Sequence, residues 1–221
     1  MGYELDFRAI AENLGLLLYG AGLTLLLTAI ASSIGIVLSI GGAATSRWGL
    51  AWARRLVATY VELIRNTPFI VQLFFIFFGL PSIGIKMPAI YAAALAMTIN
   101  LTAYSIEIVR AGIEAVPPGQ REAGFALGIT PVMVFLDIIL PQAIANVYPA
   151  LVSQIIITLL ESAVVSQVAV ADLTHAGDFI QSRTYRAFET YFVITLIYLG
   201  LALLLRWALA CAGRRLFAGR R

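Results

Sequence analysis

The fold is decided by residues 14–40, which read LGLLLYGAGLTLLLTAIASSIGIVLSI. This run lies inside a longer segment, residues 13–46, that has no charged side chain. An α-helix needs about 20 mostly apolar residues to cross the hydrocarbon core of a membrane. Residues 14–40 are long enough, and we predict that they form the first of several transmembrane helices.

Four further apolar runs follow, each bounded by charged residues. They predict transmembrane helices over approximately residues 66–85, 88–107, 142–168 and 190–211. The last run is interrupted by Arg206, whose long side chain can reach toward the membrane surface. Because the runs are continuous rather than alternating, they disfavour a transmembrane sheet. We therefore predict one all-α, polytopic membrane domain over residues 1–221, with five transmembrane helices.

The composition agrees with this fold class. The 221 residues are 61% hydrophobic and 12% charged, whereas soluble domains are about 45–50% apolar and about 25% charged. The net charge is +3, but the charges cluster between apolar runs and form no basic face, so we expect no nucleic-acid partner. The lone cysteine, Cys211, excludes an intrachain disulfide and a multi-cysteine metal site. We expect no metal site.

Arginine and lysine predict the orientation in the membrane. If the first loop is cytoplasmic, eleven of these residues lie inside and four outside, in agreement with the positive-inside rule. The outer four are Arg8, Lys86, Arg183 and Arg186. We therefore expect a multi-pass protein with its N-terminus outside and its C-terminus in the cytoplasm.

The predicted cytoplasmic segment 110–138 contains turn and helix signals in close succession. Pro117, Pro118 and Gly119 predict a turn, the following QREAGFAL predicts a short helix, and Gly128 can end it. A short helix presented between two spans can dock a partner protein. It can also lie on the membrane surface as a plain connection. These features alone leave both interpretations open.

A spaced pattern in this segment resembles a known family. Glu122-Ala123-Gly124, Gly128 and the Ile138-Ile139-Leu140-Pro141 run match the spacing of the EAA loop in permeases of binding-protein-dependent ABC importers of type I. Gly124 replaces the alanine of that pattern. Residues 62–72, 103–113 and 182–189 also resemble the branch that transports polar amino acids, including histidine, arginine, glutamate, glutamine and opines.

The resemblance implies a permease without catalytic residues, whose EAA loop is a coupling helix held in a groove of a cytoplasmic ATPase. We expect small residues there to allow close backbone approach, apolar side chains to anchor the contact, and charged side chains to form its polar rim. By position, the residues are Arg121, Glu122, Ala123, Gly124, Phe125, Leu127 and Gly128.

The resemblance also implies an assembly in a bacterial inner membrane. Its parts would be this chain, a second identical or homologous permease, two cytoplasmic ATP-binding subunits and a periplasmic amino-acid-binding protein. The chain has no Gly-rich sequence ending in Gly-Lys-Ser or Gly-Lys-Thr. ATP and Mg²⁺ would therefore bind to the partner ATPase, and we expect no cofactor on this chain.

Glu161, in the apolar context LLESAVV, is the main candidate for the substrate path. An ionisable residue inside a membrane is costly and usually faces a cavity or a partner. Many members of the branch carry lysine at this point, so the reversed charge suggests a counter-charge for a basic amino acid. An acid near the outer surface, or one paired with Arg183 or Arg186, is an equal alternative. A residue count from Pro141 places Glu161 near the outer boundary, whereas a count from Pro149 places it near the midplane.

Weaker candidates lie in the middle of the third predicted span. Asn100 and Thr102 could bind the α-amino acid group, or they could form hydrogen bonds between helices. Neutral or acidic amino acids and opines are alternative substrates to basic amino acids.

Charged residues elsewhere receive plainer interpretations. Because residues three apart share a helix face, Glu62 is predicted to pair with Arg65, and Glu107 with Arg110. Segment 172–189 is predicted to be a solvated outer loop and, from the resemblance, a candidate contact for the binding protein.

Two other function classes fit less well. A membrane-embedded enzyme needs a nucleophile and base, or clustered metal ligands, and the sequence offers none at membrane depth. A self-contained secondary transporter usually has paired repeats with broken helices, and we find no internal repeat. Uptake that does not require an ATPase would favour this second alternative.

Overall fold

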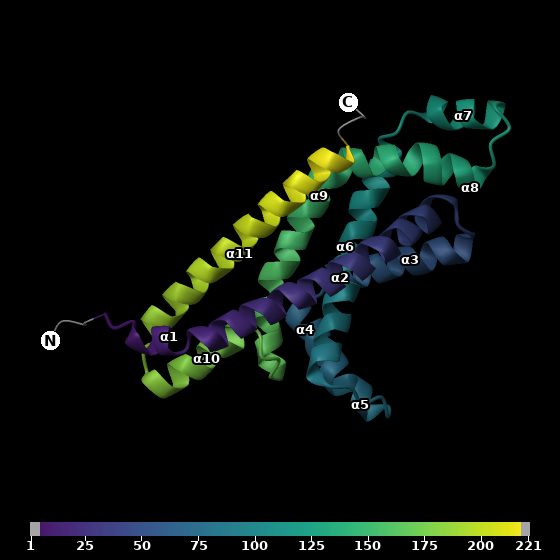
Figure 1. Cartoon of the computed structure of the whole chain (residues 1–221). Helices are drawn as coiled ribbons and strands as arrows, with labels where there is room; N and C mark the ends of the chain where they lie inside the picture. Colours follow the sequence, from purple (N-terminus) through teal and green to yellow (C-terminus); the bar gives the residue numbers. More distant parts are fainter. Residues whose placement is uncertain (1–4, 218–221) are drawn as a thin grey trace.

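The computed structural model describes residues 5–217, and within this range the chain forms helices and no strands. Figure 1 shows how they are arranged. In chain order they are α1 (Arg8–Glu12), α2 (Leu14–Trp48), α3 (Ala51–Arg65), α4 (Phe69–Phe74), the π-helical η1 (Phe75–Gly79), α5 (Leu80–Ser82), α6 (Ala89–Glu114), α7 (Pro118–Ala126), α8 (Pro131–Met133), the π-helical η2 (Val134–Ile139), α9 (Leu140–Glu161), the 3₁₀-helical η3 (Ser162–Val168), α10 (Leu173–Thr184) and α11 (Ala187–Leu216).

Four continuous helical segments within residues 5–217 are long and apolar enough to cross a membrane. They are Leu14–Trp48, Ala89–Glu114, Pro131–Val168 and Ala187–Leu216. A fifth crossing exists if α3 and the helical stretch Phe69–Ser82, which meet at 110°, form one broken span. The polytopic all-α fold is therefore confirmed, with the second predicted span replaced by a bent pair.

The bend between α3 and α4 has a local chemical cause. Pro68 has no backbone N–H, and the residue before a proline disfavours the helical conformation. Two carbonyl groups at the break are bound by one side chain, because Gln72 Nε2 donates to the oxygens of Ile64 at 2.8 Å and Thr67 at 3.0 Å. The sharp turn, whose residues 66–68 are exposed, is thus stabilised by hydrogen bonds.

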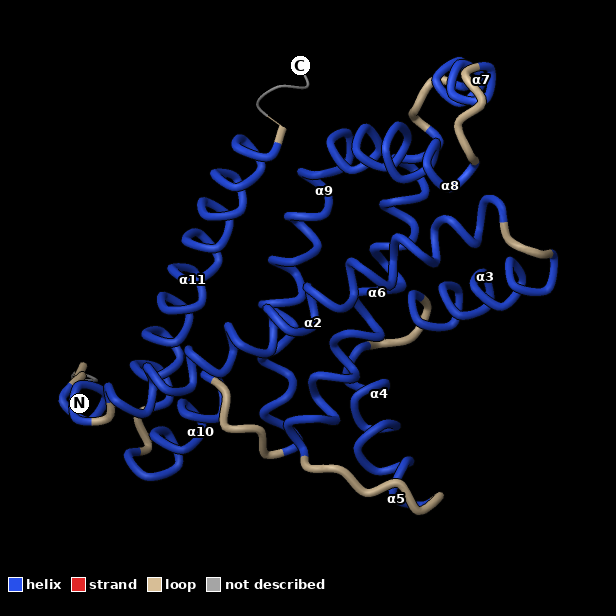
Figure 2. The backbone as a smooth tube through the Cα atoms, turned by 45° about the vertical axis from the view of Figure 1, so that its right-hand side comes forward, coloured by secondary structure: helices blue, strands red, loops and turns tan. Residues whose placement is uncertain are grey.

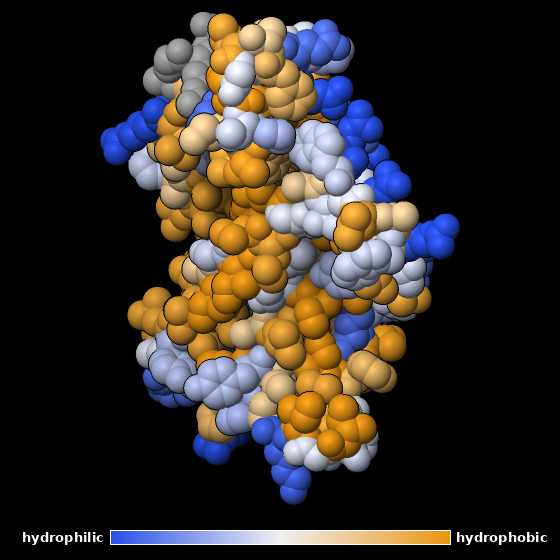
Figure 3. All heavy atoms as spheres, turned by 90° about the vertical axis from the view of Figure 1, so that its right-hand side faces the viewer, coloured by the Kyte–Doolittle hydropathy of each residue, from blue (hydrophilic) through white to orange (hydrophobic). Residues whose placement is uncertain are grey.

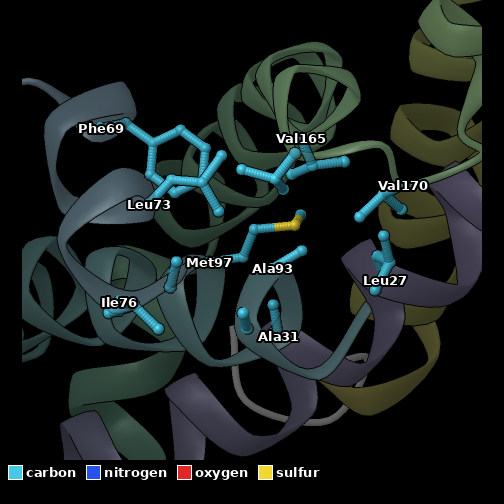
Figure 4. Close-up of a cluster of buried hydrophobic side chains, with 12 residues drawn as sticks. Leu27, Ala31, Phe69, Leu73, Ile76, Ala93, Met97, Val165 and Val170 are labelled. Atoms are coloured by element: carbon cyan, nitrogen blue, oxygen red, sulfur yellow. The ribbon is translucent and has the colours of Figure 1, made fainter. Parts of the chain in front are cut away.

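Helix α6 lies at the centre and packs against α2, α3 and α9. Small residues allow these close contacts. Ala92, Ala93 and Ala96 are fully buried on α6, and a methyl group added to Gly35 of α2 would lie 2.5 Å from Leu101 Cδ2. Figure 4 shows Met97 of α6 among side chains from α2, α4, η1 and η3. Van der Waals packing between small-residue faces is the usual basis of helix association in membranes.

The outer surface is mostly apolar. Only four of the 30 residues of α11 are buried, and its exposed side chains include Leu199, Leu203 and Leu204. Figure 3 shows hydrophobic residues across the middle of one face, with the most hydrophilic side chains at its margins. A soluble protein rarely exposes so large an apolar area, so this surface fits a lipid environment.

Candidate functional site

Helix α7 stands apart from the other helices at one end of the molecule, joined by a loop at each of its ends (Figure 2). Pro118 occupies its first turn, where the missing N–H has no helical partner to lose. At the other end, Gly128 adopts a left-handed φ of 74°. The N–H of Gly128 donates to Phe125 O and that of Ile129 to Gly124 O, which is a Schellman motif. The short helix and its glycine stop, both predicted, are confirmed.

One residue attaches α7 to the rest of the chain. Gly124 is the single buried residue of the helix, and a Cβ atom there would lie 2.8 Å from Val134 Cγ2 and 3.2 Å from Ile138 Cδ1 of η2. The close backbone approach that we predicted for this position is therefore made to the chain's own π-helical segment. A Cβ atom at this position would lie closer to Val134 than in an ordinary van der Waals contact.

The remaining predicted coupling residues lie on the other faces of α7 or just beyond its end. Glu122 and Ala123 are exposed, and Arg121 is half-buried. Two apolar side chains are exposed, Phe125 to 46% and Leu127 to 79%. The helix therefore presents an apolar pair with charged neighbours to its surroundings.

A charge network lies where α3 meets the end of α6 that leads to α7. Glu107 accepts from Arg110 at 2.8 Å, as predicted, and Arg110 also binds Glu114 at 2.9 Å. The predicted pair of Glu62 with Arg65 is wrong, because Arg65 reaches across to Glu107 at 3.6 Å. Helix α3 packs against α6, so the partner of Arg65 lies on another helix.

Asn100 and Thr102 lie inside the helix bundle and bond to the chain itself. Asn100 is 3% exposed, and its Nδ2 donates to Gln72 Oε1 at 3.0 Å, which links α6 to the bend. Its Oδ1 is buried without a hydrogen-bond partner among residues 5–217. Thr102 Oγ1 donates to the backbone oxygen of Thr98 at 2.6 Å and lies beside Gly35 of α2. Within the described chain, Asn100 therefore bonds between helices, whereas Thr102 bonds along its own helix, and their role in substrate binding stays a prediction.

Glu161 is the last residue of α9 and is half-buried. Its carboxylate forms no hydrogen bond or ion pair within residues 5–217. The alternative pairing is wrong, because Arg186 binds Glu189 at 3.3 Å and the Arg183 guanidinium lies 4.0 Å from the centre of the Phe179 ring. No hydrogen bond joins Glu161 to Asn100 or Thr102 in the described part of the chain. The three predicted path residues therefore share no hydrogen bond in this part of the chain.

The course of α9 bears on the depth of Glu161. In Figures 1 and 2, the chain from α8 into the start of α9 runs across the end of the bundle, and α9 then turns toward α10. Pro149 lies inside this helix, and proline is the usual cause of a change in helix direction. The twelve residues from Pro149 to Glu161 span about 18 Å. Which of the two depths Glu161 has in a membrane stays a prediction.

Two acidic residues in segment 172–189 are buried, although the segment was predicted to be a solvated loop. Asp172 is fully buried at the N-cap of α10, where Oδ1 accepts from His175 N at 2.9 Å and Oδ2 accepts from Tyr198 Oη at 3.2 Å. Burial raises the pKa of Asp172 to about 6. Glu189 is also fully buried and binds Arg186. Aspartate followed by a short helical pattern is an N-cap signal, and it could have identified the first of these residues.

Metal-binding chemistry finds no support in the described residues. Within residues 5–217, no three His, Cys, Asp or Glu side chains are grouped so that they could hold a metal ion. The candidate functional features in this part of the chain are an exposed helix at one end, a charge network, and a half-buried acid.

Comparison with known proteins identifies relatives that match nearly the whole chain. The chain is 34% identical to the arginine transport system permease protein ArtQ of Bacillus subtilis, over 96% of this chain and 98% of that protein. It is 31% identical to the glutamine transport system permease protein GlnP of Escherichia coli K12, over 96% of this chain and 98% of that protein. It superposes on a crystal structure of an amino acid ABC transporter with histidines with a TM-score of 0.86 and 41% identity, over 96% of this chain and all of that one.

A match to one protein family covers most of the chain. Residues 31–218 match the family described as binding-protein-dependent transport system inner membrane component. This range includes α7, the charge network and Glu161. The chain belongs to that family of inner membrane transport components.

Proposed function

We propose that the chain is the membrane-spanning permease subunit of an ATP-driven importer for polar, and more narrowly basic, amino acids. The observation that carries this proposal is α7, a short exposed helix between two spans that presents Phe125 and Leu127 without cover. Such a helix fits insertion into a groove of a partner protein. In this proposal the partner is a cytoplasmic ATPase that binds ATP and Mg²⁺.

Movement of the ATPase would pass through α7 into the bundle by a short physical route. Gly124 packs on η2, and η2 continues without a break into α9, which ends at Glu161. On the other side, three residues separate α7 from α6. Displacement of α7 would therefore act on the two helices that carry the candidate path residues. The chain supplies this mechanical link and no chemical step of its own.

Glu161 is proposed as the counter-charge for a cationic substrate. Its support is that the half-buried carboxylate has no partner within residues 5–217, and that an unpaired acid at membrane depth usually faces a cavity or a ligand. The named relatives transport arginine or glutamine, so a neutral or acidic amino acid, or an opine, is the alternative. Asn100 and Thr102 bond within the bundle, and in this proposal they shape the path through packing.

The assembly follows from the same proposal. A second identical or homologous permease would complete the path, two ATPase subunits would bind the α7 end, and a periplasmic binding protein would deliver the substrate at the α10 end. The N-terminus would then be periplasmic and the C-terminus cytoplasmic, which agrees with the arginine bias of the loops.

The test is uptake by the reconstituted complex with its ATPase and binding protein. Labelled arginine, glutamate and glutamine are compared for the parent, Glu161→Gln and the matched control Glu12→Gln, which changes an exposed acid. We expect Glu161→Gln alone to lose arginine uptake while ATP hydrolysis persists. Unchanged arginine uptake would remove Glu161 from the path. Uptake without ATP would overturn the importer proposal in favour of a secondary transporter.

A further inference from the structure

A groove of about 690 Å³ opens between α9 and α11. It lies toward the C-terminal end of α11, which is the same end of the molecule as α7 (Figure 1). Arg206 and Arg214 of α11 line one side, and Asn146 and Ser153 of α9 line the other. Val152 and Ala210 are among its apolar lining residues. Neither the coupling role of α7 nor the candidate path accounts for this groove.

Contacts beside the groove fix its shape. Tyr148 Oη donates to the backbone oxygen of Leu209 at 2.6 Å, and the Tyr148 ring occupies the space that a side chain at Gly213 would fill. The same ring meets Phe217 edge to face, with 5.3 Å between centroids. These contacts hold α11 against α9 on one side, so the opening is a formed feature of the helix pair.

The groove is positively charged without compensation. Two arginines and no acid line it, and no aspartate or glutamate occurs after Glu189 in the sequence. Within residues 5–217 Arg206 forms no ion pair, and Arg214 donates to Cys211 Sγ at 3.2 Å. Arg206 also interrupts an apolar run, where a charged residue usually meets a partner or a cavity. The positively charged lining therefore favours an anionic ligand.

The depth of the groove matches the lipid headgroup layer. Arg206 follows the start of α11 by 19 residues, or about 28 Å of helix, close to the roughly 30 Å thickness of the hydrocarbon core. Trp207, 66% exposed, stands beside it, and tryptophan and tyrosine are enriched at this interface. Basic pockets between transmembrane helices at the cytoplasmic side are suited to acidic lipid headgroups.

We propose that this groove binds one anionic phospholipid of the phosphatidylglycerol type. The guanidinium groups of Arg206 and Arg214 hold the phosphate, Asn146 and Ser153 meet the glycerol hydroxyls, and an acyl chain follows the apolar lining. The proposal depends on the membrane-spanning fold and is independent of which solute the protein transports.

The test uses the fluorescence of Trp207, which lies beside the groove, as the reporter of lipid binding. In a Trp48→Phe/Trp52→Phe background, the reconstituted complex is titrated with brominated phosphatidylglycerol in phosphatidylcholine vesicles, and quenching of Trp207 is measured. We expect saturable quenching at low mole fraction, which brominated phosphatidylcholine does not produce. Each arginine near a membrane surface strengthens binding to acidic lipid about fivefold. Arg206→Gln/Arg214→Gln should therefore weaken binding up to about 30-fold.

Arg215→Gln is the matched control, because it removes an exposed arginine one residue away that does not line the groove. It should change binding little, and Arg206→Lys should retain most of it. Equal weakening by Arg215→Gln would show a diffuse charge effect and overturn the site. If inorganic phosphate competed with brominated phosphatidylglycerol as strongly as unlabelled phosphatidylglycerol does, the groove would be a simple anion site and the proposal would be overturned. Quenching that depends only on the mole fraction of brominated lipid, whatever its headgroup, would also overturn it.

Discussion

Helices α6 and α7 are neighbours in the chain but are held in opposite ways. Fourteen of the 26 residues of α6 are buried, against one of the nine residues of α7. The central helix is fixed by packing on several sides, whereas α7 is fixed by the Gly124 contact and by the capped C-terminal end at Gly128. Substitutions in α6 should therefore change the stability of the fold, and substitutions in α7 should change what the fold does.

The largest expected difference in stability is between two leucine-to-alanine substitutions, one in α6 and one beside α7. Leu101 of α6 is fully buried and Leu127 beside α7 is 79% exposed. Leu101→Ala should lower the free energy of unfolding by about 2–5 kcal/mol because it leaves a cavity. Leu127→Ala should change it by less than about 0.5 kcal/mol. Unfolding in mixed micelles measures both, and equal losses would contradict the contrast.

A smaller effect is expected where α7 touches the bundle. Gly124→Ala places a methyl group 2.8 Å from Val134 Cγ2, and such overpacking costs about 1–3 kcal/mol. Hydrogen exchange of residues 118–126 should therefore become faster.

The control for this contact is the same change in a Val134→Ala background. There the 2.8 Å contact with Val134 Cγ2 is removed and only the contact with the flexible end of Ile138 is left, while alanine favours a helix over glycine by up to about 1 kcal/mol. Exchange should then become slower than in Val134→Ala alone. Faster exchange in both backgrounds would mean that the Val134 contact does not hold α7.

The glycine that ends α7 should contribute less. Gly128 has a φ of 74° and open space around its Cα, so Gly128→Ala introduces backbone strain without a clash. We expect a local cost of about 1–2 kcal/mol, seen as faster exchange at the end of α7 with unfolding of α6 unchanged. Gly119 lies within α7, has equally open space and has no left-handed φ. Gly119→Ala should therefore leave exchange unchanged or make it slower, and equally faster exchange in both variants would contradict the strain at Gly128.

The smallest effect is expected at the charge network between the two regions. Glu107 pairs with Arg110 and with Arg65, and these side chains are 30–42% exposed. Exposed ion pairs contribute about 0–1 kcal/mol, so Glu107→Gln should lower stability by no more than that. The loss should shrink in high salt. A loss above about 2 kcal/mol that is insensitive to salt would mean that the network acts as a buried one.

The sequence predicts the spans well because hydropathy measures directly what a membrane selects. It misses α3, which precedes the predicted span 66–85, because Arg54, Arg55 and Glu62 give this helix the composition of a loop although it packs against α2 and α6. Pro68 signals the break, but its 110° angle depends on the contacts of Gln72.

The candidate site is predicted in its location more than in its contacts. Proline and glycine mark the limits of α7 in the sequence itself, and its exposure follows from its charges. That Gly124 faces Val134, or that Asn100 meets Gln72 across 28 residues, depends on how helices pack, and no local pattern encodes this. The buried state of Asp172 and Glu189 is hidden for the same reason, since charged residues are almost never fully buried unless they are paired.

The central claim is that α7 transmits ATP hydrolysis to transport, and the direct test is the number of amino acids imported per ATP hydrolysed. The reconstituted complex is compared with Leu127→Glu and with Ile83→Glu, which alters a similarly exposed residue at the other end of the molecule. Loss of an apolar anchor from a docked surface costs at least about 2 kcal/mol. Leu127→Glu should therefore lower the ratio at least about tenfold with unchanged thermal stability, while Ile83→Glu retains it. A normal ratio for Leu127→Glu would contradict the account.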